Sequence, residues 1–408
     1  MKSLPIIGAL PPPARGGATY SYGLSASGFR PFFLVAAAIA VVLVPLWVLL
    51  LDGSLSQRTT YLTPMGWHAH EMVFGFSCAV VAGFLLTAVR NWTQRETASG
   101  AALYGLAALW GLGRLVMTVR LGLPAPAIAI IDLAFLPALA LSVARPIIAS
   151  GNRRNYAMIG VLALLFMANV AVHLDALGVA PGWQLRATHT AVIVLVLLSA
   201  IIAGRVIPMF TRNATGSTRI VSVAWLDIAA IAAIAGYLVF ELVAPFSRPA
   251  TVAAALAGVF VVVRAARWGG VASLRHPLLW ILHAGHAWIG IGFALRVAAM
   301  MTTRISTTAA THALTVGAVG SLTLGMMARV SLGHTGRSLV LRPITVAAFA
   351  LVTLAAVLRV FGPILGASAL AYPTWLALSA TAWAAAFALF LAAYLRVLVS
   401  PRADGKPG

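Results

Sequence analysis

The stretch GWHAHEMVFGF at residues 66–76 places two histidines and a glutamate at the start of an apolar segment. After Glu71, the 18 residues 72–89 carry no charge, which is close to the length of about 20 apolar residues that crosses a bilayer. Ionisable groups at the mouth of a membrane helix are costly and mark functional positions. We therefore interpret this stretch as the outer end of a transmembrane helix that carries a site.

The composition of the whole chain agrees with a membrane bundle. Of 408 residues, 61% are hydrophobic and 9% charged, against about 25% charged in soluble domains, and the mean hydropathy is +0.98. We predict an all-α, polytopic bundle formed by a single transmembrane domain over residues 26–399, between short tails at 1–25 and 400–408. Twelve spans are expected, at 29–51, 66–89, 98–119, 125–144, 156–178, 186–208, 221–244, 250–268, 278–301, 306–329, 344–365 and 374–398.

The net charge of +20 indicates topology, not nucleic-acid binding, because Lys and Arg gather in cytoplasmic loops of membrane proteins. Twenty of the 28 basic residues fall in the two tails and the loops after even-numbered spans. The opposite side holds Arg58, Arg120, Arg186, Arg248 and Arg304, and the spans hold Arg114, Arg296 and Arg359. We expect a multi-pass protein in the lipid bilayer with both termini cytoplasmic.

The histidines gather at one depth. His68, His70, His173, His189 and His312 lie in the outer leaflet, whereas His283 and His286 lie in the inner half of span 9. Imidazole is the commonest metal ligand and suits iron, copper and zinc. A single cysteine excludes an internal disulfide and a cysteine-based cluster, and eight acidic residues supply few oxygen ligands. The alternative for each histidine is a hydrogen bond between helices.

Three histidine-bearing spans recur with a regular period. His70 and His189 are 119 residues apart, and His189 and His312 are 123 apart, on spans 2, 6 and 10. The period indicates three four-helix units around a pseudo-threefold axis, and coincidence is the alternative. Haem–copper oxidases share this plan of twelve spans with metal ligands on helices 2, 6 and 10. The resemblance is architectural only, because their His-Pro-Glu signature is absent here.

Within HAHE, His68 and His70 point to nearly opposite faces of a helix. They serve different centres, or one ligates a metal and the other supports it. Glu71 is our candidate catalytic residue and the natural partner for a ring N–H of a ligating histidine; a helix-N-terminal acid is the alternative. His283 and His286 share a face and either bind a second metal or hydrogen-bond to a neighbouring helix.

Three long motifs resemble the NnrS family of bacterial membrane proteins. They are WHAHEMVFGF with VAGFLLTAVRNWT, GRVIPMFTRN, and HALTVGAVGSLTLGMMARVSLGHTGR, and the resemblance covers residues 25–360. It implies haem b and copper in a bacterial cytoplasmic (inner) membrane, and a role in nitric oxide stress and denitrification. The best pairing assigns His70 and His312 to haem iron and His68 and His189 to copper, with Glu71 in support. His286 and His283 are further candidates for metal or haem.

The resemblance implies a haem–copper protein that binds or processes nitric oxide, an apolar molecule that enters the bilayer. An electron donor, if one is used, is not visible in the sequence. Two alternatives stay open: a transporter of metal or of a nitrosylated iron species, and a non-catalytic haem sensor or storage protein. No span has a strong central Gly or Pro break, which tells against transport. Haem propionates are natural partners for arginines inside spans, and snorkelling to the interface is the alternative.

Overall fold

The computed structural model describes residues 23–55, 61–365 and 370–406, and the regular secondary structure in these residues is entirely helical. Twelve helical stretches in this part of the chain are long and apolar enough to cross a membrane. The predicted all-α membrane bundle is therefore confirmed. The tail predicted at 1–25 lies almost wholly outside the described residues.

We number the spans 1–12 in chain order. Nine spans consist of one α-helix each, two of them with a short segment beside the helix: α1 (Phe29–Leu51), α4 (Gly100–Thr118), α7 (Tyr156–Ala176, preceded by the 3-10 turn η2, Arg153–Asn155), α8 (Gln184–Thr215), α9 (Ala224–Val243), α10 (Arg248–Ala265), α12 (Pro277–Met301, preceded by the short α11, Gly270–Ser273), α15 (Pro343–Leu365) and α16 (Tyr372–Val399). The other three are composite: span 2 is α2 (Pro64–His70), η1 (Glu71–Ser77) and α3 (Cys78–Thr93); span 4 is α5 (Ala125–Leu133) and α6 (Phe135–Ala149); span 10 is α13 (Thr307–His312), η3 (Ala313–Gly320) and α14 (Ser321–Gly333).

Helix α8 extends further than its apolar run predicts. It spans 32 residues and is followed by Gly216, whose φ of 67° suits a residue without a side chain. Pro208 lies inside it, and Thr211 Oγ1 donates to the carbonyl of Ile207 on the preceding turn. At 1.5 Å per residue α8 is about 48 Å long. This exceeds the thickness of the hydrocarbon core, about 30 Å, and the PMFTRN segment forms the last part of the helix.

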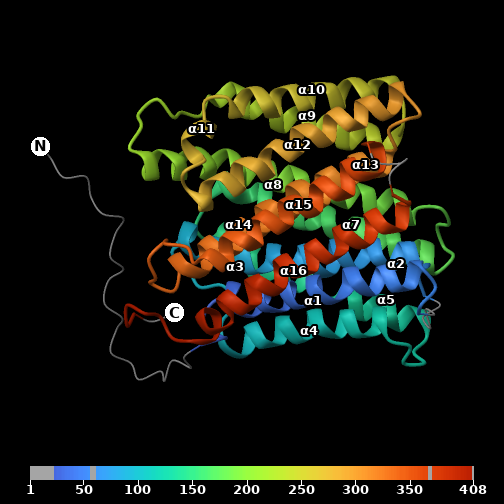
Figure 1. Ribbon diagram of the computed structural model, residues 1–408. Helices are drawn as coiled ribbons and strands as arrows, with labels where there is room; N and C mark the ends of the chain where they lie inside the picture. Colours follow the sequence, from blue (N-terminus) through green and yellow to red (C-terminus); the bar gives the residue numbers. More distant parts are fainter. Residues whose placement is uncertain (1–22, 56–60, 366–369, 407–408) are drawn as a thin grey trace, which may run out of the picture.

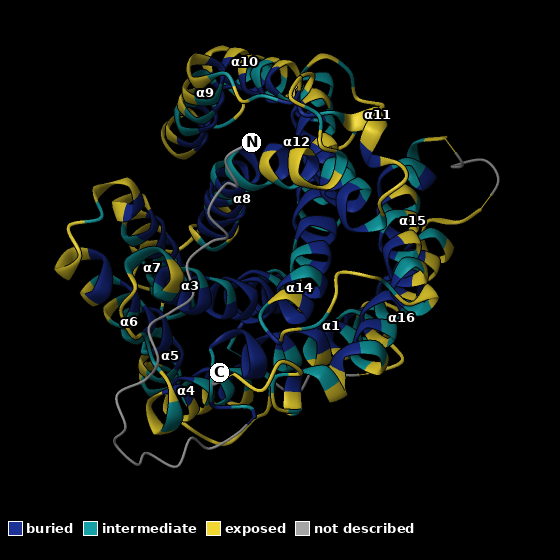
Figure 2. Cartoon of the chain, turned by 90° about the vertical axis from the view of Figure 1, so that its left-hand side faces the viewer, coloured by how far each residue is buried: buried dark blue, intermediate teal, exposed yellow. Residues whose placement is uncertain are grey.

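Spans 2, 6 and 10 form the centre of the bundle. In their apolar windows 83%, 67% and 72% of residues are buried, against at most 61% in any other candidate span. Seen along the bundle, α3, α8 and α14 surround the middle while the remaining helices lie outside them (Figure 2). Every fourth span is therefore central, as the predicted pseudo-threefold plan requires.

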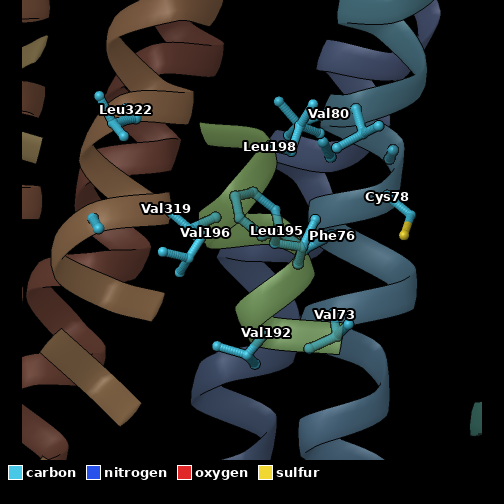
Figure 3. Close-up of a cluster of buried hydrophobic side chains, with 14 of the residues drawn as sticks. Val73, Phe76, Cys78, Val80, Val192, Leu195, Val196, Leu198, Val319 and Leu322 are labelled. Atoms are coloured by element: carbon cyan, nitrogen blue, oxygen red, sulfur yellow. The ribbon is translucent and has the colours of Figure 1, made fainter. Parts of the chain in front are cut away.

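Apolar side chains from these three spans belong to one cluster of buried residues (Figure 3). Val80, Leu198 and Leu322, one from each span, are all buried in one continuous hydrophobic core. The close approach of neighbouring helices requires glycine: a Cβ at Gly83 would lie 2.9 Å from the Phe33 ring. This packing fixes the relative rotation of the helices, and that rotation decides which side chains face one another.

The first and last spans lie side by side (Figure 1). Arg30, at the start of α1, donates from Nη1 to the carbonyls of Leu398 and Ser400 at 2.8 and 2.7 Å. These carbonyls lie at the C-terminal end of α16, where helix carbonyls lack internal partners. The two described ends of the chain are therefore at the same face of the bundle, as an even number of spans requires.

Candidate functional site

A cavity of about 570 Å³ lies between spans 2, 6 and 10, in the half of the bundle opposite the two described chain ends. Its deepest lining residues along these spans are Ser77, Leu195 and Val319. At the other end the lining reaches exposed residues such as Met65 and Arg186. Its size falls in the range of about 300–1,000 Å³ that holds drug-sized ligands and cofactors.

One histidine from each central span lines this cavity: His68 from α2, His189 from α8 and His312 from α13. They occupy the fifth or sixth position of their spans, so they lie at one level. The ring of His68 stacks on Trp47 of α1, with centroids 4.8 Å apart and planes 14° apart. The cavity thus combines three imidazoles with an aromatic and aliphatic wall.

Two of these imidazoles are oriented by hydrogen-bonding groups at Nδ1. His312 Nδ1 donates to the carbonyl of Thr308 at 2.8 Å, and His189 Nδ1 lies 3.3 Å from Oε1 of Glu241. Glu241 is itself held by Arg296, whose Nη2 is 2.7 and 2.9 Å from its two oxygens. A proton on Nδ1 leaves the Nε2 lone pair free for a ligand, which is the arrangement of metal-ligating histidines.

Spans 2 and 10 share a local irregularity beside these histidines. The π-helix η1 begins at Glu71, directly after α2, and the π-helix η3 begins at Ala313, directly after His312. Wide turns of this kind inside α-helices occur frequently at functional sites. An extra residue per turn rotates the helix that follows relative to the one before. The outer histidines can therefore face the cavity while α3 and α14 pack in the core.

A second cluster lies outside the cavity lining, around His70 of α2. His70 Nε2 is 3.3 Å and His173 Nε2 is 3.0 Å from Oδ2 of Asp132. The ligand atoms of all three residues lie within 4.8 Å of one another, and all three are buried. Two imidazoles and one carboxylate form a donor set that can hold a metal ion. We call these three residues the Asp132 cluster.

The Nδ1 atoms of the two histidines in the Asp132 cluster also have partners. His70 Nδ1 lies 3.1 Å from Oε1 of Glu71, and His173 Nδ1 lies 2.6 Å from the hydroxyl of Tyr61. Burial and the nearby Asp132 carboxylate raise the pKa of Tyr61, so it is a neutral phenol. His173 therefore directs Nε2 to Asp132, whereas His70 Nε2 lies between Asp132 and the amide oxygen of Asn169, which is 3.0 Å away. A second group holds each ring at Nδ1, as in metal sites with outer-shell partners.

The Asp132 cluster also contacts Arg114 of α4 and Asn169 of α7. Arg114 donates to both Glu71 and Asp132, and the amide of Asn169 donates to Asp132 Oδ2 at 2.8 Å. These bonds balance part of the negative charge of the two buried carboxylates. They also offer an alternative in which His70 completes a closed, metal-free hydrogen-bond network.

The sequence matches the NnrS protein family over residues 23–402. This match covers nearly the whole chain, including both groups of histidines. The chain belongs to the NnrS family. The predicted family is therefore confirmed. A comparison with curated proteins found no match.

The third histidine group of this NnrS protein, His283 and His286, lies away from the cavity lining. His283 Nε2 lies 3.0 Å from Thr211 Oγ1, and His286 Nε2 donates to the carbonyl of Val261 at 3.2 Å. The His286 ring packs against Trp268, with centroids 4.6 Å apart. Its Nδ1 is buried and has no hydrogen-bond partner among the described residues. Both histidines therefore use their Nε2 atoms in contacts with neighbouring helices.

The structure distributes the candidate residues of this NnrS protein differently from the expected pairing. His312 and His70 are not brought together: His312 lines the cavity and His70 belongs to the Asp132 cluster. His68, His189 and His312 share the cavity, and Glu71 contacts His70. The reason is rotation, because His68 and His70 are about 200° apart on the helix at 100° per residue.

Sequence reasoning missed the partners of His70. Asp132 lies in span 4, and Asn169 and His173 are four residues apart on one face of α7. The available signal was an acidic residue inside an apolar span, which is costly without a partner. The glycines at 75, 83, 317 and 320 do not line the cavity, and their missing side chains make room for side chains of neighbouring helices.

Proposed function

We propose that the chain is a haem–copper membrane protein that binds or processes nitric oxide, with haem b in the central cavity and copper at the Asp132 cluster. One observation carries the proposal. Three histidines, one from each of the three most buried spans, line a single cavity of cofactor size. Membership of the NnrS family supports it, because the resemblance implies haem and copper.

The residues of the cavity fit a haem. His189 and His312 offer Nε2 atoms in a fixed orientation, held by Glu241 and by the Thr308 carbonyl. The third, His68, has a buried Nδ1 without a partner among the described residues. Trp47 and Trp383 give the wall flat apolar surfaces. A bound haem supplies an iron position at which nitric oxide binds, while the apolar wall limits water and admits an apolar molecule from the bilayer.

The residues of the Asp132 cluster fit a copper ion, because imidazole nitrogen with one carboxylate oxygen suits divalent copper. Glu71 holds His70 in the required orientation and Tyr61 holds His173. In this arrangement Glu71 orients a ligand, and a bound copper supplies one-electron redox chemistry. The unpartnered Nδ1 of His286 is a further candidate position for a metal.

Transport is the less supported alternative. Transporters of this size bind substrate at helices that unwind near the midplane. The irregular segments of the central spans are π-helices, which keep their backbone hydrogen bonds. The lining of the cavity also stops within the bundle, at Ser77, Leu195 and Val319 on the three central spans. Both observations favour a cofactor site over a conduit.

The experiment that tests the proposal is an optical spectrum and metal analysis of the purified full-length protein, followed by titration with nitric oxide. We expect a Soret band, bound copper and a shift of the Soret band on addition of nitric oxide. Absence of a Soret band would refute the haem proposal and the sensor alternative together. A haem signal that does not respond to nitric oxide would refute the proposed ligand.

A further inference from the structure

Three arginines lie inside the predicted spans, and the structure pairs two of them with carboxylates. Arg114 binds Glu71 and Asp132, and Arg296 binds Glu241. All eight Asp and Glu residues of the chain are among the described residues. None of them lies within ion-pair distance of the third arginine, Arg359.

Arg359 lines the central cavity from α15. It lies six residues before the outer end of its helix, close to the level of the cavity histidines. His68 and His312 line the same cavity from α2 and α13, so the guanidinium and both imidazoles face one space. Its aromatic neighbour is Tyr372, whose ring centroid is 5.6 Å from the guanidinium carbon.

The cavity as a whole has an excess of positive charge. Its charged lining residues are Arg186, Arg296, Arg359 and Glu241. Once Glu241 and Arg296 are paired, Arg359 is the cation left inside, and Arg186 is exposed at the mouth. A guanidinium stays charged at every accessible pH, and a charge at membrane depth is retained when it has a partner or a function.

We propose that Arg359 binds a planar oxyanion group in the cavity, beside His68 and His312. A carboxylate and a nitrite ion both present two oxygens in one plane, and the guanidinium fork donates two parallel hydrogen bonds to such a group. The group is either a carboxylate of the bound haem, which rests on the proposed function, or a free anion of nitrite size, which does not.

The test compares Arg359→Gln, which removes the charge, with Arg359→Lys, which keeps it without the fork. Arg304→Gln, at an exposed outer loop, is the matched control. The first measurement is the rate of haem transfer to apomyoglobin from full-length protein reconstituted with haem or with haem dimethyl ester. For a haem carboxylate, Arg359→Gln should lose haem about tenfold faster or more, the effect of one charge-assisted interaction, with an intermediate rate for Arg359→Lys. With haem dimethyl ester, which lacks free carboxylates, wild type and variants should transfer haem at the same rate.

The second measurement is calorimetric titration of the haem-free protein with nitrite. For a free anion, nitrite affinity should fall about tenfold or more in Arg359→Gln, while haem transfer stays at the wild-type rate. Wild-type haem transfer together with wild-type nitrite binding would overturn the proposal. If the wild type takes up no haem, the proposed function fails, and the nitrite titration still decides the role of Arg359. Monodisperse elution on size exclusion confirms that each variant is folded.

Discussion

His68 and His70 stand two positions apart on α2 and belong to different sites. His68 stacks on Trp47 at the cavity wall, whereas His70 Nε2 lies 3.3 Å from Oδ2 of the buried Asp132. One short helix therefore contributes to both the cavity and the Asp132 cluster. This arrangement makes the two sites separable by mutation, because each histidine can be removed without deleting the other.

Glu241 is expected to strengthen cofactor binding through His189. Glu241→Gln keeps the shape of the side chain but weakens the acceptor at Nδ1 of His189 and removes the counter-charge of Arg296. We expect haem affinity to fall by about 10–100-fold, the usual effect of losing a group that orients a metal ligand. Haem transfer to apomyoglobin measures it. Glu96→Gln is the control, because Glu96 pairs with Arg90 and does not line the cavity. Equal haem retention in both variants would show that Glu241 has no role in the site.

His286 gives a separate prediction for the inner half of the bundle. If its unpartnered Nδ1 binds a metal, His286→Ala should lower metal content or alter the haem spectrum while the protein stays folded. His276→Ala, in an exposed position before α12, should change neither. A wild-type spectrum and metal content in His286→Ala would assign His283 and His286 to helix packing.

Close packing at Gly83 predicts a loss of stability on adding one methyl group. A Cβ there would approach the Phe33 ring to 2.9 Å and Phe32 Cβ to 3.1 Å, and both residues are fully buried. We expect Gly83→Ala to lower the free energy of unfolding by about 1–3 kcal/mol, the usual cost of overpacking. Thermal unfolding in detergent measures it. Gly236→Ala on α9, where nothing lies within 4 Å, should be neutral or stabilising, and equal midpoints for the two variants would contradict the packing account.

The distribution of Lys and Arg predicts that both termini lie in the cytoplasm. Ser54→Cys, between α1 and α2, should react with an impermeant maleimide added to intact cells. Gly216→Cys, directly after α8, should react only after permeabilisation. The native Cys78 is buried, so background labelling should be low. The opposite labelling pattern would invert the protein and turn the cavity mouth to the cytoplasm.

The positions of the twelve spans and the depth of the histidines could be read from the sequence, because hydropathy and residue number report both directly. The grouping of the histidines could not. Which of His68 and His70 faces the cavity depends on the rotation of α2, and that rotation is set by packing and by the π-helix that follows. The partnership of His70 with Asp132 and His173 joins spans 2, 4 and 5, and no local pattern encodes it.

The most direct test of the two-site account is the haem and copper content of two sets of single variants in the full-length protein. The cavity set is His68→Ala, His189→Ala and His312→Ala, and the cluster set is His70→Ala, Asp132→Asn and His173→Ala. We predict that the cavity set loses haem and keeps copper, whereas the cluster set loses copper and keeps haem. Full occupancy by both metals in all six folded variants, or loss of haem in the cluster set with retention in the cavity set, would contradict the account.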